Sequence, residues 1–208
     1  MKPARPPRRL PVVERKVAAM CGRFAMDAKT DELIREFVAG GGDPQDWWKE
    51  WHGSYSIAPT DQAPIIRDRG DGRFLELVRW DWEKPKNMRP GVPLINAGVE
   101  KLAAGFWAPA FTAARCVVPM RGYFEWTGEK GAKIPHYLHG DGLLTPDAMD
   151  AWLEPVKLDR PGRENMLSLL DGSSTAIAST IEQYVVDRKV NNTRTVDRDD
   201  PTVIAPAA

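Results

Sequence analysis

Cys21 is the residue of this sequence best suited to covalent chemistry. It directly follows Met20, so a chain that starts at Met20 and loses that methionine begins with cysteine. An N-terminal cysteine carries an α-amine with a pKa of about 8 and a thiol with a pKa of about 8.5. The amine can form an imine with an aldehyde, and the sulfur can add to the same carbon to close a five-membered thiazolidine ring. The alternative is a small buried hydrophobe in a strand.

Glu125 and Asn96 have side chains that suit the proton transfer and the positioning that this reaction needs. Glu125 stands between two aromatic residues, where desolvation raises the pKa of a carboxyl and lets it donate and accept protons near neutral pH. The alternative is an exposed strand glutamate. Asn96 follows an apolar run, and its amide can donate to a sugar oxygen or hold the Cys21 amine. Its alternative role is to cap the turn before Gly98.

Positive charges alternate with aromatic rings in two parts of the sequence. Arg23 lies two residues after Cys21, where a guanidinium can bind a phosphate. Arg79, Trp80 and Trp82 combine charge with rings that can stack on bases, as in proteins that bind single-stranded nucleic acid. The alternative is a core tryptophan beside a solvated basic loop. Arg188 could line the same groove, or it could lie on a solvated strand face.

The strands and helices that the sequence predicts around these residues indicate an α+β fold with a mixed, mostly antiparallel sheet and flanking helices. Strands are expected at residues 63–67, 74–80, 116–119, 123–127, 136–139 and 183–186, which are rich in aromatic and β-branched residues and are separated by Gly, Pro and Asp turn signals. Helices are expected from Thr30 to the glycines at 40–42, from Thr145 through Leu153, over residues 164–170, and from Ser174 through Ile181.

Composition narrows the class of protein. A chain of 208 residues with 42% hydrophobic residues fits one domain, which we place at residues 20–208. Lys plus Arg and Asp plus Glu both total 29, so any contact with nucleic acid must come from a local patch. Cys21 and Cys116 are the only cysteines, which predicts no disulfide framework, no zinc site and a reducing cytoplasm. No cofactor motif or membrane span is present, and the oligomeric state is left open.

Residues 1–20 differ in composition from the rest, with six Lys or Arg, one Glu and four prolines. We interpret residues 1–19 as a disordered basic extension or an untranslated leader. A start at Met20 is favoured over a propeptide cut before Cys21 and over a basic arm that binds nucleic acid. The thiazolidine chemistry requires Cys21 to be terminal, because an uncleaved extension occupies the amine.

Five short segments in order give the sequence a resemblance to the SRAP family, the SOS response-associated peptidases. They are residues 20–24, 53–60, 94–100, 121–126 and 187–192. The resemblance implies a β-barrel core and a DNA-damage function in which abasic sites in single-stranded DNA are crosslinked through the N-terminal cysteine. It implies catalytic roles for Cys21, Asn96 and Glu125, with Glu125 as acid and base and Asn96 as the positioning residue. It also invites the alternative of a cysteine autopeptidase that removes the residues before Cys21.

One departure from the family pattern affects both the expected fold and the expected chemistry. Family members usually carry two further strands and a His-x-Arg-Met-Pro segment that supplies a catalytic histidine, whereas here residues 134–142 run straight into the segment 144–153. We therefore expect an incomplete sheet and slow or irreversible crosslinking. A catalytically impaired relative that binds single-stranded DNA without a covalent bond is the further alternative. His136 and His139 are expected on opposite faces of one strand, in structural roles.

Overall fold

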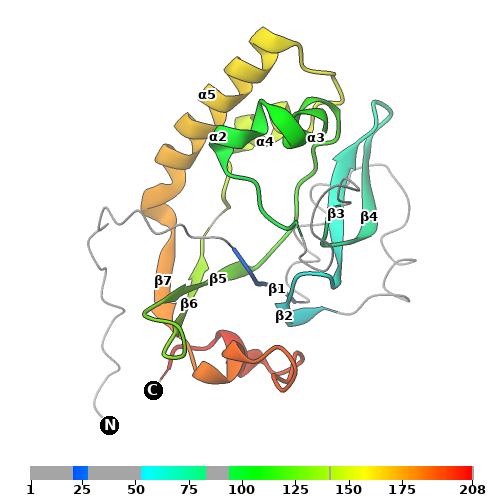
Figure 1. Cartoon of the computed structure of the whole chain (residues 1–208). Helices are drawn as coiled ribbons and strands as arrows, with labels where there is room; N and C mark the ends of the chain where they lie inside the picture. The colour runs from blue at the N-terminus through cyan, green and yellow to red at the C-terminus, as the bar shows by residue number, and fades with distance from the viewer. Residues whose placement is uncertain (1–20, 28–52, 83–93, 141, 208) are drawn as a thin grey trace.

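The computed structural model describes residues 21–27, 53–82, 94–140 and 142–207. In that part of the chain the sheet elements lie between a group of helices at one end and the C-terminal segment at the other (Figure 1). Five strands form one antiparallel sheet in the order β2-β1-β5-β6-β7, and β3 pairs with β4 in a separate hairpin. The prediction of an α+β fold with mostly antiparallel pairing is confirmed. The helix expected from Thr30 lies outside the described residues.

The strands are β1 (Phe24–Met26), β2 (Ser54–Ile57), β3 (Gln62–Asp68), β4 (Arg73–Arg79), β5 (Gly122–Thr127), β6 (Ile134–His139) and β7 (Glu182–Val185). The α-helices are α2 (Val99–Leu102), α3 (Ala108–Ala113), α4 (Pro146–Leu153) and α5 (Arg160–Ile177). Short 3₁₀ helices are η2 (Gly105–Trp107), η3 (Ala178–Thr180), η4 (Arg188–Asn191) and η5 (Pro201–Ile204). None of the helices among these described residues is long and apolar enough to cross a membrane.

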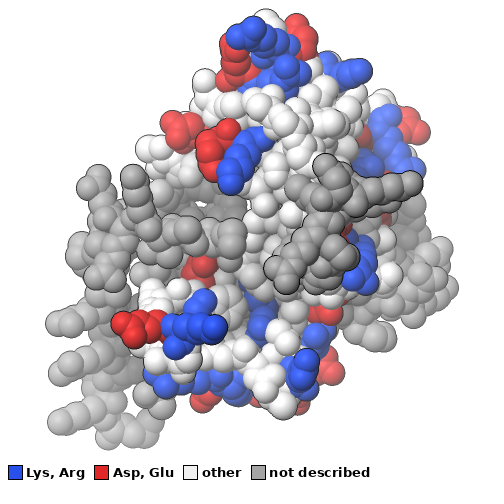
Figure 2. Space-filling model, in the orientation of Figure 1, with Lys and Arg blue, Asp and Glu red and all other residues white. Residues whose placement is uncertain are grey.

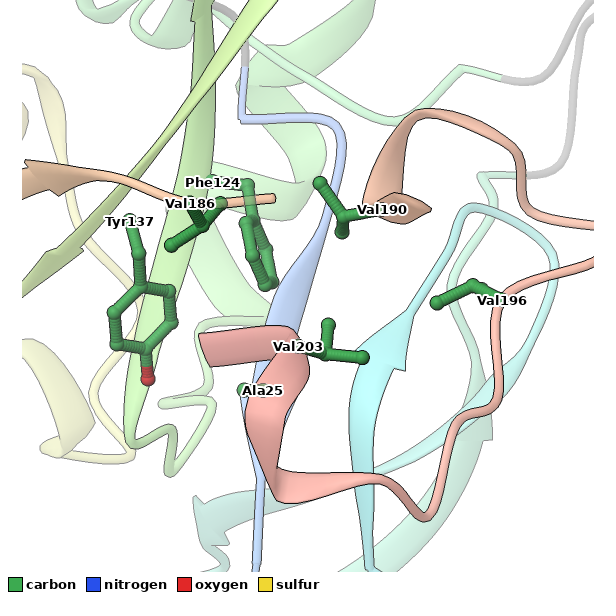
Figure 3. Packing of buried hydrophobic residues seen from close by; sticks show 7 residues of the cluster. All are labelled: Ala25, Phe124, Tyr137, Val186, Val190, Val196 and Val203. Atoms are coloured by element: carbon green, nitrogen blue, oxygen red, sulfur yellow. The ribbon is translucent and has the colours of Figure 1, made fainter. Parts of the chain in front are cut away.

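β1 contributes to a hydrophobic cluster on each face of the sheet. Phe24 and Met26 point into one cluster, while Ala25 points into the other, as the alternation of a strand requires. Figure 3 shows the second cluster, in which Phe124 from β5 packs among valines of the C-terminal segment. The residues that follow Cys21 are therefore fixed by packing from both sides.

The β5–β6 hairpin sets the direction of Glu125. Phe124 pairs with Tyr137, and both are buried in the second cluster. The next pair along the ladder, Glu125 and His136, must then point to the opposite face of the sheet. The pleat thus places a carboxyl and an imidazole side by side on one surface.

Two expectations from the sequence are wrong in detail. Residues 116–119 form no strand but only an isolated bridge between Ile66 and Val117, because the proline and the turn that follow stop the ladder. The two helices expected over 164–170 and from Ser174 are one helix, α5, which starts about one turn earlier. Asp159 caps it, with Oδ1 accepting from the Gly162 amide at 2.7 Å, and Gly172 does not interrupt it. The sheet is not a closed barrel in the described chain, where β2 and β7 are its ends, which agrees with the expectation of an incomplete sheet.

β7 covers the edge of β6, the strand that precedes the point where the family pattern departs. Four residue pairs join β6 to β7, from His136 with Val185 to His139 with Glu182. The C-terminal segment in turn protects β7, since the Ala207 amide donates to the Val185 carbonyl at 2.8 Å. A strand from late in the sequence therefore pairs an edge that would otherwise be open to association with another chain.

Gly122 is a position where the close approach of Tyr137 excludes any side chain. A Cβ atom there would lie 2.4 Å from the Leu138 carbonyl oxygen and 2.6 Å from the Tyr137 hydroxyl oxygen. We predict that Gly122→Ala lowers the free energy of unfolding by about 1–3 kcal/mol through overpacking. The measurement is urea denaturation, with Gly172→Ala as the control because nothing lies within 4 Å of a Cβ at that helical position. Equal stability of the Gly122 variant and the wild type would contradict the prediction.

Candidate active site around Cys21

Cys21 lies just before β1, half-buried, and is held from two sides. Its thiol donates to the Arg23 carbonyl, with 3.6 Å between sulfur and oxygen. The Asn96 amide nitrogen donates to the Cys21 carbonyl oxygen at 3.0 Å. Asn96 belongs to the segment that leads into α2, 75 residues along the chain. The sequence predicted a positioning role for Asn96, and the amide is placed to fix the Cys21 backbone.

The surroundings of Cys21 favour its neutral thiol. Burial raises the pKa of the Cys21 thiol to about 11, and the nearby Glu125 carboxylate adds to the effect because a thiolate would be repelled by it. At neutral pH the sulfur therefore carries its proton. An attack by this sulfur requires a base that removes the proton as the new bond forms.

Glu125 is a carboxyl whose charge acts on the Cys21 thiol. Burial raises the pKa of the Glu125 carboxyl above its ordinary value, and the Lys133 ammonium opposes the shift. Tyr123, two residues earlier on the same face of β5, has a raised pKa through burial and through the charges of Glu125 and Cys21. These mutual effects put Cys21, Tyr123 and Glu125 within electrostatic reach of one another.

Arg23 connects β1 to the C-terminal segment. Its side chain is buried, and one terminal nitrogen donates to the Val190 carbonyl and to the Ser56 hydroxyl, the latter at 3.4 Å. The guanidinium carbon lies 5.5 Å from the centre of the Trp126 ring, within the range of a cation–π contact. Arg23 Nε is buried and has no hydrogen-bond partner in the described residues.

A hollow of about 450 Å³ opens beside Cys21. Its lining comes from three parts of the sequence: Gly22, Arg23, Trp126, Gly131, Lys133 and Asn191. One chain of hydrogen bonds organises it, since the Trp126 indole donates to the Asn191 side-chain oxygen at 2.7 Å and the Asn191 amide donates to the Lys133 carbonyl at 3.0 Å. On the face of the molecule drawn in Figure 2, side chains of both signs of charge are interspersed.

The other residues proposed for DNA binding differ in their surroundings. Trp80 packs against Phe24, with ring centres 5.1 Å apart, and its indole donates to the Ile95 carbonyl at 3.2 Å. That ring is part of the core and is not an exposed platform for a base. Arg79, exposed at the end of β4, lies 3.9 Å from the Asp81 carboxylate. Arg188 is exposed at the start of η4.

Trp82 belongs to an aromatic cluster that the sequence did not indicate. Its ring lies 6.4 Å from that of Phe106 and 5.8 Å from that of Trp107, both in η2. All three rings are half-buried. Packing of this kind fixes η2 near the segment that carries Asn96, so part of the role of Trp82 is structural.

The structure also shows three residues near the site to which the sequence reasoning gave no functional role. Lys133 and Asn191 line the hollow, and His136 pairs with Glu125 across the β5–β6 ladder. The His136 Nε2 atom lies 2.9 Å from the Thr127 hydroxyl, and burial lowers the pKa of the ring. His139 packs instead on Tyr137, which confirms the expected opposite faces. Alternation along β6 was the signal that could have paired His136 with Glu125.

In the described residues, no group of three or more His, Cys, Asp and Glu side chains could hold a metal ion. The groups at the site are a thiol, a carboxyl, an amide and an ammonium. They are suited to nucleophilic addition and proton transfer to a carbonyl carbon.

Sequence comparison finds a match to the family model SOS response associated peptidase (SRAP) over residues 20–143. The chain is 31% identical over 123 residues to the abasic site processing protein YoqW of Bacillus subtilis (strain 168), covering 56% of this chain and 52% of that protein. It is 28% identical over 126 residues to the abasic site processing protein YedK of Escherichia coli (strain K12), covering 58% and 54%. The chain therefore matches about half the length of these curated relatives.

Solved structures support the fold. A phage-related protein from Bordetella bronchiseptica superposes with a TM-score of 0.62 at 18% identity, covering 81% of this chain and 95% of that one. A protein from Bacteroides thetaiotaomicron superposes with a TM-score of 0.57 at 17% identity, covering 90% and 100%. Similarity at this level of identity concerns the arrangement of the backbone.

Proposed function

Because the chain belongs to the SOS response-associated peptidase (SRAP) family, we propose that it captures abasic sites in single-stranded DNA as a covalent thiazolidine at Cys21. The proposal is supported by the names of its relatives, which are abasic site processing proteins. The observation that carries it is the convergence of Cys21, Asn96 and Glu125 from three separate segments. The reaction requires Met20 and everything before it to be absent from the functional protein.

In the proposed mechanism the α-amine of Cys21 attacks first, because the thiol is neutral at pH 7. The amine nitrogen bonds to the aldehyde carbon of the ring-opened sugar and forms a carbinolamine. Protonated Glu125 gives its proton to the carbinolamine hydroxyl, which leaves as water, and an iminium ion remains. Asn96 holds the Cys21 backbone so that the sulfur stays on the same side as this carbon.

Ring closure then restores the proton to Glu125. The Glu125 carboxylate takes the thiol proton as the sulfur bonds to the iminium carbon, and the thiazolidine closes. The balance is one aldehyde and one aminothiol giving one ring and one water, with Glu125 protonated at the start and at the end. A carboxyl with a raised pKa suits this cycle, since the shift increases the fraction of Glu125 that is protonated and able to act as the acid.

We predict a Cys21-dependent adduct that survives denaturation. Protein shown by intact mass to begin at Cys21 is mixed with a labelled single-stranded oligonucleotide that contains one abasic site, and the products are separated on a denaturing gel. Cys21→Ala and a protein that retains Met20 are the matched controls. Retained Met20 moves the free amine one residue away from the thiol, so the five-membered ring cannot form.

The outcome of this experiment distinguishes covalent capture of the abasic site from noncovalent binding of the DNA. An adduct with the Cys21-terminal protein alone supports the thiazolidine. If folded protein that begins at Cys21 gives no adduct but binds the oligonucleotide, the covalent proposal is wrong and the impaired, noncovalent relative is supported. Autopeptidase activity is the second candidate, because the family model is named for a peptidase and the chain carries the set of Cys21, Asn96 and Glu125. Removal of residues 1–20 from the full chain but not from its Cys21→Ala variant, measured by mass spectrometry, would support that activity.

A further inference from the structure

We propose that the hollow beside Cys21 is a phosphate subsite for the DNA backbone next to the abasic sugar, with Lys133 as its cation. The proposal rests on the proposed function, because it assigns the hollow to the same DNA strand. Lys133 was not among the candidates from the sequence. The assignment follows from the composition of the hollow, its position and the freedom of the Lys133 side chain.

The lining of the hollow has positive charge without a compensating acid. Arg23 and Lys133 contribute one positive charge each, and the other lining residues are neutral. The Arg23 guanidinium is buried and committed to the Val190 carbonyl and the Ser56 hydroxyl, so it supplies a fixed field. An electropositive hollow of this kind attracts an anion, and an amide such as Asn191 adds neutral hydrogen-bonding capacity.

Lys133 is the member of the lining that is free to bind. It is exposed, and no hydrogen bond or ion pair of its ammonium is found in the described structure. Its carbonyl, in contrast, accepts from Asn191, which fixes the backbone at the point where the side chain leaves. The base of the side chain is therefore held while the ammonium can reach a ligand, as a phosphate-binding lysine requires.

The position of the hollow identifies which phosphate it would hold. Gly22 lines it and is bonded directly to Cys21, so an anion in the hollow lies next to the nucleophile. A strand whose abasic sugar reaches Cys21 has a phosphate on each side of that sugar, and one of the two falls at the hollow. The Lys133 ammonium also opposes the raised pKa of Glu125. A bound phosphate would weaken that effect and favour the protonated carboxyl that begins the reaction.

The test uses noncovalent binding of single-stranded DNA with a tetrahydrofuran abasic analogue, which has no aldehyde and cannot crosslink. We expect Lys133→Gln to weaken binding about 3- to 10-fold at low salt and to reduce the slope of log K against log salt by about 0.7. Lys130→Gln is the matched control, since Lys130 is exposed in the same turn but does not line the hollow. It should leave the slope unchanged.

A neutral methylphosphonate, placed at one linkage at a time beside the analogue, locates the contact. At one of the two adjacent linkages, the methylphosphonate should weaken binding by the wild type as much as Lys133→Gln weakens binding to unmodified DNA. At that same linkage, the methylphosphonate should not weaken binding by the Lys133→Gln variant any further. The proposal would be overturned if the affinity losses from the methylphosphonate and from Lys133→Gln added fully at both linkages. An unchanged salt slope in Lys133→Gln would also overturn it. Competition by inorganic phosphate at equal ionic strength without a linkage-specific effect would assign the hollow to free phosphate. Because no aldehyde is present, these outcomes do not depend on the crosslinking chemistry.

Discussion

Glu125→Gln is expected to slow formation of the covalent adduct about 100-fold to 10,000-fold, the usual contribution of a general acid and base. Glutamine keeps the shape and the hydrogen-bonding capacity of the side chain but cannot give a proton to the leaving hydroxyl or take one from the thiol. Dehydration depends on Glu125 as the acid that protonates the leaving hydroxyl. Ring closure depends on it as the base, because the Cys21 thiol has a pKa of about 11 and does not ionise unaided at neutral pH. Single-turnover crosslinking, followed on denaturing gels, measures the rate.

The dependence of this rate on pH gives a second, independent test. Dehydration needs the free α-amine and the protonated carboxyl, so the rate follows the product of the two fractions. It should rise with pH up to the pKa of Glu125, which burial places above its ordinary value. Between that pKa and the amine pKa of about 8 the rate should be flat, because one fraction rises as the other falls, and above it the rate should decline.

The Glu125→Gln variant should show only the titration of the amine. Its rate should keep rising through the region where the wild-type rate is flat, and should level off above a pH of about 8. Glu129→Gln is the control, since Glu129 is an exposed carboxyl in the turn of the same hairpin. A wild-type profile without the flat region, or equal rates for Glu125→Gln and wild type, would remove Glu125 from the mechanism.

Arg115→Leu is expected to lower the free energy of unfolding by about 3–5 kcal/mol, because several backbone carbonyls would lose a charged donor and each that stays unsatisfied costs about 1–3 kcal/mol. Arg115 is 7% exposed, and its guanidinium donates to five backbone carbonyls. The acceptors are Phe111, Thr112, Trp152, Glu154 and Val156, at 2.6–3.1 Å. One side chain thus satisfies the C-terminal ends of both α3 and α4, where carbonyls lack partners within the helix.

Urea denaturation of Arg115→Leu, Arg115→Lys and Arg160→Leu tests this account. Lysine keeps the charge but has three donors on a single nitrogen, so we expect it to recover only part of the loss. Arg160 has a side chain that is 85% exposed and should tolerate leucine within about 0.5 kcal/mol. A loss below about 1 kcal/mol in Arg115→Leu would show that solvent can satisfy the five carbonyls.

The sequence predicted the longer strands and α4 well because their signals are local. A high content of aromatic and branched apolar residues in β3 to β6, and a proline at the first turn of α4, indicate those elements with little help from the rest of the chain. β1 and β2 have three and four residues, too few for a periodic pattern, and burial on both faces removes alternation from β1. α5 was divided in two because Ser174 was interpreted as an N-cap, whereas in the structure it lies inside one continuous helix.

For the site, the sequence indicated Cys21, Asn96 and Glu125 because motif and chemistry pointed to the same residues. It did not indicate that Trp80 packs on Phe24, since an aromatic residue beside basic residues looks the same in the core and on a surface. Lys133 was missed because it lies in a turn. Only the pairing of β5 with β6 and the hydrogen bond from Asn191 bring it to Cys21. Juxtapositions of that kind depend on the whole fold.

The contact between Arg23 and the Val190 carbonyl joins two segments that are synthesised at different times during translation. Val190 follows Arg23 by 167 residues, so a ribosome makes Cys21 long before the segment that supports it. During translation the cysteine exists without Glu125, then without the C-terminal residues that hold β1 in place. A translation product that stops early and begins at Cys21 therefore has the reactive pair but not the site, and its reactivity toward aldehydes is that of a free N-terminal cysteine.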